Sequence, residues 1–476
     1  MKKHFSALLC MAALLTVFCL PVSAKTLDTA FATGASCTVS GSTISYTATL
    51  PEVPAGDDGM IHLYELKTYQ YAIPAGAAPV ASVPASANPA FSFALNRGQA
   101  NTRLYSKFVL AVNKGGVPTM IANPQYINNP EAIATNTKGR AGAAAKATHD
   151  SGFTNVYLTG GGTVNTAGVH SVAQILNNGS NPTLVNPYAK MADSHPVPSV
   201  SSKLYMLNAA DDAGVASLAA DMVALAANSG AQDFIIGNEV NERIWNYMAW
   251  TDWDTYMREY AQAFRVCYTA IKSTNANANV YICLDQNWDR NRAPGHAEYY
   301  NYIDDKDFLE KFNGLIATGG NLNWNVALHP YPVPLTYAKF WDMSGCPDGG
   351  YMAAQVNGGK MITFQNMSLL TNTLAQPAYL NKNGAVRGVI MSEIGLSATQ
   401  GTDVQAAAIC AAYAAMQRNP YVSQFIYLSN LGDGVDSRLT GKALEVYNAL
   451  GTPNEAAYME WAKAYIGISD WGQILH

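Results

Sequence analysis

The sequence predicts an α/β protein in which a (β/α)8 TIM barrel is preceded by a small all-β sandwich domain. Three observations lead to this prediction. The chain has 476 residues, which is too long for one small domain and too short for more than about three. Up to residue 128, Thr, Val, Tyr and Ile alternate with polar residues. From about residue 129, Ala-rich helical segments alternate with short apolar strands, which is typical of a parallel α/β domain.

The composition excludes several classes of protein. Aromatic residues make up 10% of the chain, and charged residues only 13%, with a formal net charge of -5. Disordered chains carry more charge and fewer aromatic residues, and nucleic-acid-binding proteins carry basic patches. We therefore expect a folded protein that does not bind nucleic acid. Its polar residues are mostly uncharged, which suits a neutral partner better than an anionic one.

The first 24 residues predict a signal peptide. Lys2 and Lys3 precede an apolar run over residues 7–20, and Val22-Ser23-Ala24 fits the pattern of a cleavage site. Two lysines and no acidic residue would leave with the peptide, so the net charge changes from -5 to -7. Since no later apolar stretch is long enough to cross a bilayer, we expect a secreted, periplasmic or cell-surface protein without a stable membrane span.

The cysteines predict neither a metal nor a redox site. None of the five that follow the signal peptide has the CxxC spacing, and their odd number leaves at least one free thiol. Cys267, Cys283 and Cys410 fall in apolar segments, so we expect them to be small buried hydrophobic residues.

Residues 25–128 predict the β-sandwich domain. Pro- and Gly-rich breaks at 51–58 and 73–89 separate the strand-like runs, as in small antiparallel sandwiches. The predicted strands cover residues 36–50, 59–71, 90–95 and 106–113. Such a domain either binds a ligand or supports its neighbour, and its residues favour neither role.

Residues 129–476 predict the barrel. The clearest helix covers 251–273, where Thr251 and Asp254 resemble a capping box and apolar residues recur at helical spacing. Eight strands separated by helices indicate a (β/α)8 barrel with long loops. The predicted strands cover residues 153–158, 183–186, 204–208, 234–237, 280–284, 324–328, 386–391 and 424–428.

Two of these apolar strands end in a carboxylate. The fourth runs into Glu239 and the seventh into Glu393. Active sites of such barrels lie at the carboxyl ends of the strands, and a buried acid there is costly unless it is paired. Two carboxylates that face one cavity suit a general acid and a nucleophile acting on a glycosidic bond.

Gly237-Asn238-Glu239 and Ser392-Glu393-Ile394-Gly395 resemble the motifs of retaining glycoside hydrolases of clan GH-A. The resemblance implies that Glu239 is the acid/base, assisted by Asn238, and that Glu393 is the nucleophile. The clan has an aromatic residue or a His at the end of the sixth strand, and the resemblance implies that His329 or Tyr331 takes this position. The clan implies an equatorial, often β-, linkage.

The sequence is most similar to an uncharacterised family of secreted bacterial barrels, a domain of unknown function for which no substrate is known. The resemblance extends from about residue 103 to 440. It is carried by residues 237–241, 245–248, 256–264, 284–288, 329–335 and 392–393.

The chain departs from the clan at two strands. The Arg that often follows the second strand is absent from Leu184-Val185-Asn186-Pro187-Tyr188, and Tyr427 stands where the eighth strand often has Trp. Glu242 is a second candidate for the acid. We prefer Glu239 because it is nearer the end of the strand.

Tryptophans follow the catalytic strands, and Trp offers a flat apolar surface to a sugar ring. We expect Trp245 and Trp288 to face the ligand.

No HExxH motif or close His pair supports metal catalysis, so we expect no cofactor. The sequence predicts a secreted retaining glycoside hydrolase whose substrate is an oligo- or polysaccharide. The alternative is a catalytically inactive glycan-binding barrel protein, because fold does not determine function.

Overall fold

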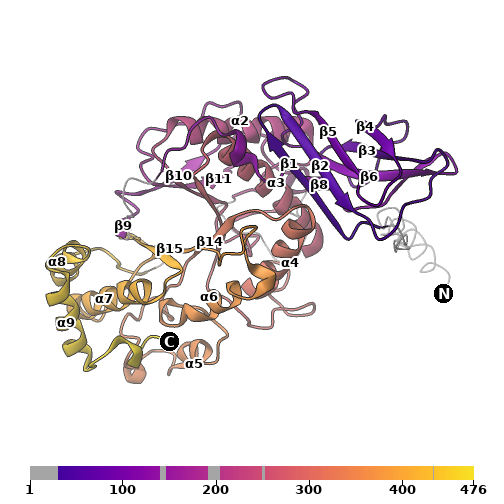
Figure 1. Cartoon of the computed structure of the whole chain (residues 1–476). Coiled ribbons are helices and arrows are strands. Elements are labelled where there is room, and N and C mark those ends of the chain that lie inside the picture. The colour runs from indigo at the N-terminus through magenta and orange to yellow at the C-terminus, as the bar shows by residue number, and fades with distance from the viewer. Residues whose placement is uncertain (1–30, 140–145, 191–203, 249–251, 433) are drawn as a thin grey trace, which may run out of the picture.

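The computed structural model describes residues 31–139, 146–190, 204–248, 252–432 and 434–476. An N-terminal pair of antiparallel sheets precedes an eight-stranded parallel sheet that forms a nearly closed barrel (Figure 1). The predicted signal peptide and Thr251 lie outside the described residues. Among the described helices, none has the length and apolar character needed to cross a bilayer.

The two antiparallel sheets pack as a sandwich. Ile44 and Tyr46 of one sheet share a hydrophobic core with Leu63, Phe108 and Leu110 of the other. The first sheet has the order β1-β2-β5, and the second has the order β4-β3-β6-β7 with β8 paired to β6. The bounds are β1 Gly34–Ser40, β2 Thr43–Thr49, β3 Met60–Leu66, β4 Ala81–Pro84, β5 Ala90–Ala94, β6 Lys107–Lys114, β7 Val117–Met120 and β8 Gln125–Tyr126.

The predicted strand 36–50 is a hairpin of β1 and β2, which turns at Gly41 with a φ of 55°. β4 lies inside 73–89, which the sequence predicts to be a break, because its four residues include Pro84 and are too few to give a strand pattern. The domain boundary at residue 128 stays a prediction.

The barrel confirms the predicted fold class. Its strands pair in the order β10-β11-β12-β13-β14-β15-β16-β9, and all pairs are parallel. Their bounds are β9 Lys146–Thr148, β10 Phe153–Tyr157, β11 Val172–Leu176, β12 Asp233–Ile236, β13 Asn279–Leu284, β14 Trp324–Leu328, β15 Val389–Ile394 and β16 Val422–Tyr427.

Two strand predictions were wrong. Segments 183–186 and 204–208 form only isolated bridges, such as Val185 with Leu207, and the barrel uses β9 and β11 instead. β9 has only three residues, and Gln174 interrupts the apolar pattern of β11. Since both replacements precede β12, the strands that end near Glu239 and Glu393 remain the fourth and the seventh.

In the described part of the barrel, the first α-helix comes after β11. Within the described residues, the connections from β9 to β10 and from β10 to β11 contain no helix. The α-helices are α2 Asp212–Asn228, α3 Trp253–Thr274, α4 Asp305–Thr318, α5 Tyr351–Asn357, α6 Ser368–Leu374, α7 Thr402–Arg418, α8 Gly441–Ala449 and α9 Glu455–Ile466. Short 3-10 helices are η1 Pro130–Ile133, η2 Pro187–Lys190, η3 Met343–Gly345, η4 Phe364–Asn366, η5 Pro377–Tyr379 and η6 Trp471–Gln473.

The predicted helix 251–273 is α3, but its cap differs. Asp252 accepts a hydrogen bond from the Thr255 backbone N–H at 2.6 Å and therefore serves as the N-cap, rather than Thr251.

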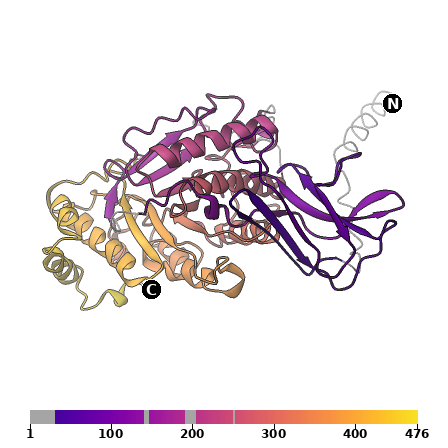
Figure 2. The ribbon, with the colours of Figure 1, turned by 45° about the horizontal axis from the view of Figure 1, so that its top comes forward.

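The sandwich packs against one side of the barrel, and α8 and α9 lie on the opposite side (Figure 2). The Tyr126 N–H donates to the Gly319 carbonyl at 2.9 Å, and the Gln125 side chain donates to the Thr318 carbonyl at 2.9 Å. The Tyr71 hydroxyl reaches the Gln262 side chain on α3 at 2.9 Å. The domain contacts are therefore polar as well as apolar.

Candidate active site

Four neighbouring strands deliver titratable side chains to one edge of the barrel. Glu239 follows β12, Asp285 follows β13, His329 follows β14, and Glu393 stands near the end of β15. The carboxyl ends of parallel barrel strands lie on the same face, which is why residues far apart in the sequence meet here.

A strained turn after β12 presents Glu239. Gly237 has a φ of 88°, and a Cβ atom there would lie 2.6 Å from the Val240 side chain, so the turn requires glycine. Glu239 itself has a φ of 37°, which is uncommon for a residue with a side chain. The Glu242 N–H donates to the Glu239 carbonyl at 2.8 Å and closes the turn. Strain of this kind is frequent at functional sites.

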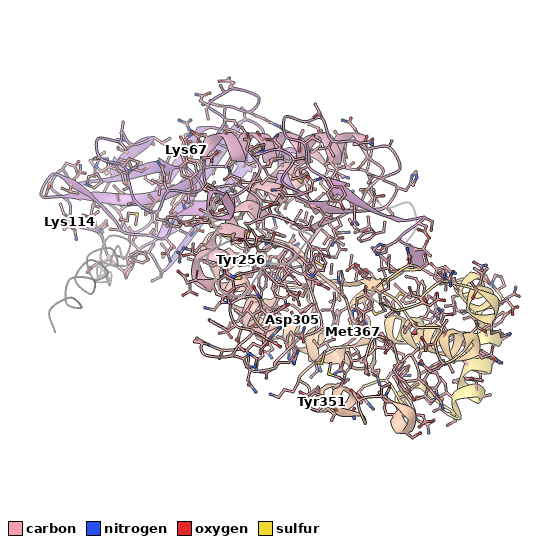
Figure 3. The ribbon with its side chains drawn as sticks, turned by 180° about the vertical axis from the view of Figure 1, so that it is seen from behind. Lys67, Lys114, Tyr256, Asp305, Tyr351 and Met367 are labelled. Carbon is pink, nitrogen blue, oxygen red and sulfur yellow. The ribbon has the colours of Figure 1, made fainter. Side chains whose placement is uncertain are left out.

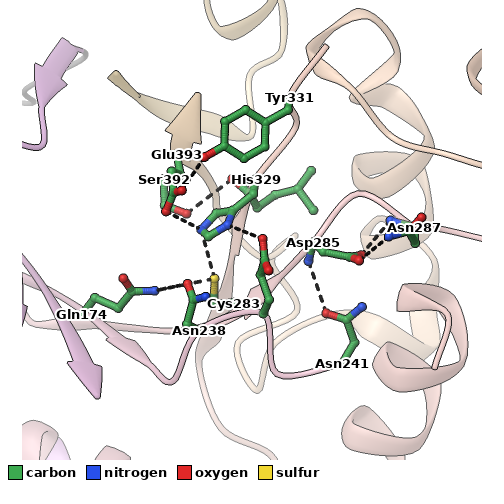
Figure 4. Close-up of polar contacts among 12 residues, drawn as sticks. Gln174, Asn238, Asn241, Cys283, Asp285, Asn287, His329, Tyr331, Ser392 and Glu393 are labelled. Carbon is green, nitrogen blue, oxygen red and sulfur yellow. Dashed lines mark hydrogen bonds and ion pairs between the residues drawn. The ribbon is translucent and has the colours of Figure 1, made fainter. Parts of the chain in front are cut away.

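His329 lies between the two predicted catalytic carboxylates. Figure 4 shows its ring beside Glu393 and Cys283. Its Nδ1 is 2.8 Å from Glu239 Oε1, and its Nε2 is 3.6 Å from Glu393 Oε2. Nε2 also lies 3.3 Å from the thiol of Cys283, which lines the barrel interior. The His329 side chain is only 1% exposed, so this imidazole contacts protein groups on both sides.

An irregularity in β15 presents Glu393. Met391 pairs with Phe425 and Ile394 pairs with Tyr427, so the two residues between them face one residue of β16, as in a β-bulge. The Tyr331 hydroxyl donates a hydrogen bond to Glu393 Oε1. The Glu393 side chain is 19% exposed and that of Glu239 is 17% exposed. Both carboxylates are therefore fixed by protein groups and still accessible.

The surroundings of Glu239 and His329 shift the pKa values of both groups. Burial raises the pKa of Glu239, and the charges of Asp285 and Glu393 add to this effect, whereas the contact with His329 opposes it. Burial lowers the pKa of His329, but the acidic groups around it, Cys283, Glu393 and Glu239, together raise this pKa well above its usual value. Glu239 and His329, which are 2.8 Å apart, can thus exchange a proton.

A second group of carboxylates is buried beside this site. Burial and the charge of Asp285 raise the pKa values of Glu242 and Asp305 well above their usual value. Although burial opposes it, a hydrogen bond from Glu242 and the charge of Arg292 lower the pKa of Asp285. The Arg292 side chain also pairs with Asp304 at 2.8 Å, and both are at most 3% exposed.

The structure brings together four of the seven predicted site residues, namely Glu239, Glu393, His329 and Tyr331. Asn238 is half-buried, and its Oδ1 accepts a hydrogen bond from Gln174 at 2.8 Å. The expectation that Trp245 and Trp288 face a ligand stays a prediction for Trp245 and is not supported for Trp288. Trp288 is 6% exposed and packs in the core between strands and helices, and Trp245 is half-buried. Trp288 therefore has little surface to offer a ligand.

The sequence reasoning missed several contributors. Asp285 follows an apolar strand as Glu239 does, so the same rule could have identified it. Cys283 is buried and free, as expected, but its thiol also contacts His329. His149, at the end of β9, places its Nε2 3.3 Å from the Ser392 carbonyl. No sequence signal pointed to it, because β9 was not predicted.

Within the described part of the chain, no group of three or more His, Cys, Asp or Glu side chains has an arrangement that could hold a metal ion. The site instead offers two accessible carboxylates, a proton-exchanging imidazole and a tyrosine hydroxyl. This set can transfer protons and can attack an electrophilic carbon.

Residues 161–474 match the family described as "Family of unknown function (DUF5722)". The match covers more than half of the chain, so this protein belongs to that family, and the identification made from the sequence is confirmed. No curated protein matches the chain.

Solved structures similar to the chain include glycoside hydrolases. A family 39 glycoside hydrolase from Bacteroides cellulosilyticus WH2 is 13% identical, and the alignment covers 87% of this chain and 79% of that one, with a TM-score of 0.36. A Paenibacillus polymyxa xyloglucanase of family 44 is 13% identical over 68% of this chain and 76% of that one, with a TM-score of 0.35. Fungal β-1,4-galactanases are 14% identical over 66% and 86%, with a TM-score of 0.33.

Proposed function

We propose that this protein is a retaining glycoside hydrolase that cleaves a β-linked oligo- or polysaccharide. The observation that carries the proposal is the position of Glu239 and Glu393. They come from the ends of the fourth and seventh barrel strands, and each lies beside a different nitrogen of one imidazole. Two accessible carboxylates at the carboxyl face of a barrel are the minimum equipment for glycoside hydrolysis.

In the first step, Glu239 donates its proton to the glycosidic oxygen while a carboxylate oxygen of Glu393 attacks the anomeric carbon. The bond between that carbon and the leaving oxygen breaks, and a glycosyl ester of Glu393 forms. In the second step, Glu239 takes a proton from water. The water oxygen attacks the anomeric carbon, the ester bond breaks, and the sugar leaves with its original configuration.

The neighbouring groups suit these roles. Burial and nearby charges raise the pKa of Glu239, which favours the protonated form that a general acid needs. The Tyr331 hydroxyl fixes one oxygen of Glu393 and leaves the other for attack. His329 contacts both carboxylates and can exchange a proton with Glu239 between the two steps.

Glu239 suits the acid better than Glu242 does. Glu239 has an exposed oxygen side and contacts His329, whereas Glu242 is 7% exposed and hydrogen-bonds to Asp285. A carboxyl that is shielded from solvent cannot reach a glycosidic oxygen. We further propose that the enzyme acts after export, because residues 1–24 have the features of a signal peptide.

The test is a panel of aryl β-glycosides and plant, fungal and bacterial polysaccharides, followed by NMR of the first anomer released. We expect retention of configuration. Glu393→Gln should lower kcat/KM by about 10⁴-fold or more without a change in the thermal unfolding midpoint.

Azide distinguishes the two roles on the best aryl substrate. With Glu393→Gly, azide should restore turnover and give a glycosyl azide of inverted configuration. With Glu239→Ala, the glycosyl azide should have retained configuration. Near-normal activity of Glu393→Gln contradicts the nucleophile assignment. A wild type that binds glycans, with an affinity unchanged in Glu393→Gln, and hydrolyses none is the inactive glycan-binding barrel instead.

A further inference from the structure

A second cavity lies at the junction of the sandwich and the barrel, apart from the carboxylates of the active site. Its volume is about 240 Å³. The sandwich side contributes Tyr71, Lys107 and Tyr126, and α3 contributes Arg258 and Arg265. Of the twelve residues that line the cavity, three are cationic and none is acidic.

Lys107 is buried at the edge of this cavity. The residue is 4% exposed, and its ammonium donates one hydrogen bond, to the Thr68 carbonyl at 2.9 Å. The nitrogen also lies 4.5 Å from the centre of the Tyr71 ring. An ammonium has three donors, so the described contacts use only part of its capacity.

Arg265 is equally buried, at 4% exposure. Its Nη2 donates to the Ile316 and Gly320 carbonyls at the end of α4, and its guanidinium lies 4.6 Å from the centre of the Tyr126 ring. Lys107 lies 5.8 Å from the same ring, so Tyr126 contacts both cations.

The positive charges around this cavity lack a matched negative charge. In the described part of the chain, Lys107, Arg258 and Arg265 form no ion pair. Asp252 interacts electrostatically with Arg258, and the other nearby acid is Glu259. Its carboxylate accepts a hydrogen bond from Asn186 at 2.8 Å, and burial raises its pKa.

The shortage of negative charge affects Lys107 directly. Burial and the charge of Arg265 lower the pKa of Lys107 to about 8, although Glu259 opposes this effect. Removing cations from water is costly unless a counter-charge compensates them. An anion in the cavity would supply that compensation.

We propose that this junction cavity binds a small oxyanion, held by Lys107, Arg258 and Arg265. Guanidinium and ammonium groups recognise phosphate and carboxylate by charge-assisted hydrogen bonds. The volume is below the range of about 300–1,000 Å³ that is usual for drug-sized ligands, so it admits a small anion better than a glycan chain. The ligand is an inorganic oxyanion or the carboxylate of a sugar acid. Because its residues come from both domains, the bound anion would tie the sandwich to the barrel.

The test is isothermal titration calorimetry of the full chain with inorganic phosphate and, separately, with glucuronate, at constant ionic strength set by sodium chloride. Thermal unfolding in the same buffers gives a second readout. We expect at least one of these anions to bind and to raise the unfolding midpoint above that in chloride. Binding of phosphate alone identifies an inorganic anion, and binding of glucuronate identifies a sugar acid.

Variants locate the binding. Lys107→Met and Arg258→Gln should each weaken it by about tenfold or more, the loss expected for one charge-assisted hydrogen bond. Arg258 is half-buried on α3, so its variant keeps the test available if Lys107→Met does not fold. Lys114→Met is the control, because Lys114 is exposed at the outer end of the sandwich (Figure 3). Absence of binding by both anions, or unchanged affinity in the Lys107 and Arg258 variants, contradicts the proposal.

Discussion

Two groups of carboxylates lie beyond the strand ends of the same barrel, and they differ in exposure and in partner. The proposed catalytic pair, Glu239 and Glu393, is 17% and 19% exposed and contacts His329. The acidic cluster, Glu242, Asp285 and Asp305, is at most 7% exposed. The pair contacts an imidazole that can gain or lose a proton. In the cluster, Glu242 hydrogen-bonds to Asp285, and the buried Arg292–Asp304 ion pair lies beside it.

This difference shows that a strand-end position does not make an acid catalytic. A catalytic carboxylate must reach the substrate and must change its charge during the reaction. A sealed carboxylate can do neither, but its fixed charge can tune a neighbour. In this protein, Asp285 contributes to the raised pKa of Glu239.

The largest expected effect is on catalytic rate, and it distinguishes Glu239 from Glu242 as the general acid. Glu239→Gln should lower kcat on a substrate with a poor leaving group by about 10²–10⁴-fold, because the general acid is lost. Glu242→Gln should lower it by less than about tenfold, because its carboxyl is only 7% exposed and is shielded from the substrate. Steady-state kinetics on poor and good leaving groups is the measurement. A greater loss for Glu242→Gln would reverse the assignment.

The next effect concerns stability. Arg292→Met leaves Asp304 buried without its partner and should lower the free energy of unfolding by about 3–5 kcal/mol. Arg438→Met is the matched control. Its ion pair with Asp436 is at the surface, with side chains 72% and 47% exposed, so we expect a loss of at most about 1 kcal/mol. Urea denaturation measures both, and equal losses would show that the buried Arg292–Asp304 pair stabilises the fold no more than the exposed pair does.

The smallest effect is on the pH profile. Because ionisation of Glu239 removes the acid, activity falls as pH rises through its pKa. Asp285→Asn removes a negative charge that opposes this ionisation, so the pKa falls and the basic limb of the kcat/KM profile moves to lower pH. We expect the optimum rate to change by less than about tenfold. Asp289→Asn, on the same loop but paired with Lys306, should leave the profile in place. A basic limb that moves to higher pH would contradict the electrostatic role of Asp285.

Much of the fold could be predicted from the sequence where strands are long and apolar. Asp233–Ile236, Asn279–Leu284 and Trp324–Leu328 were located to within a residue, because buried parallel strands have near-continuous hydrophobic runs. β9 and β11 could not be found in this way, since one is too short and the other places Gln174 inside the barrel.

The candidate site could be predicted only in part. Glu239 and Glu393 each end an apolar run, and His329 and Tyr331 follow a third, so a rule about strand ends selects them. Trp288 follows the same rule and is buried, because the loop after β13 folds back onto the helices. Side-chain direction in a loop depends on packing that no local pattern encodes.

The sequence by itself determined the barrel class and showed which two strands end near the carboxylates Glu239 and Glu393, because hydrophobic periodicity and strand ends are local properties. The tertiary structure decided the rest. It placed one imidazole between Glu239 and Glu393, sealed Glu242 with Asp285, and gathered Lys107, Arg258 and Arg265 around one cavity. These outcomes depend on distances between residues far apart in the chain, and only the closed packing of the barrel and the sandwich fixes those distances.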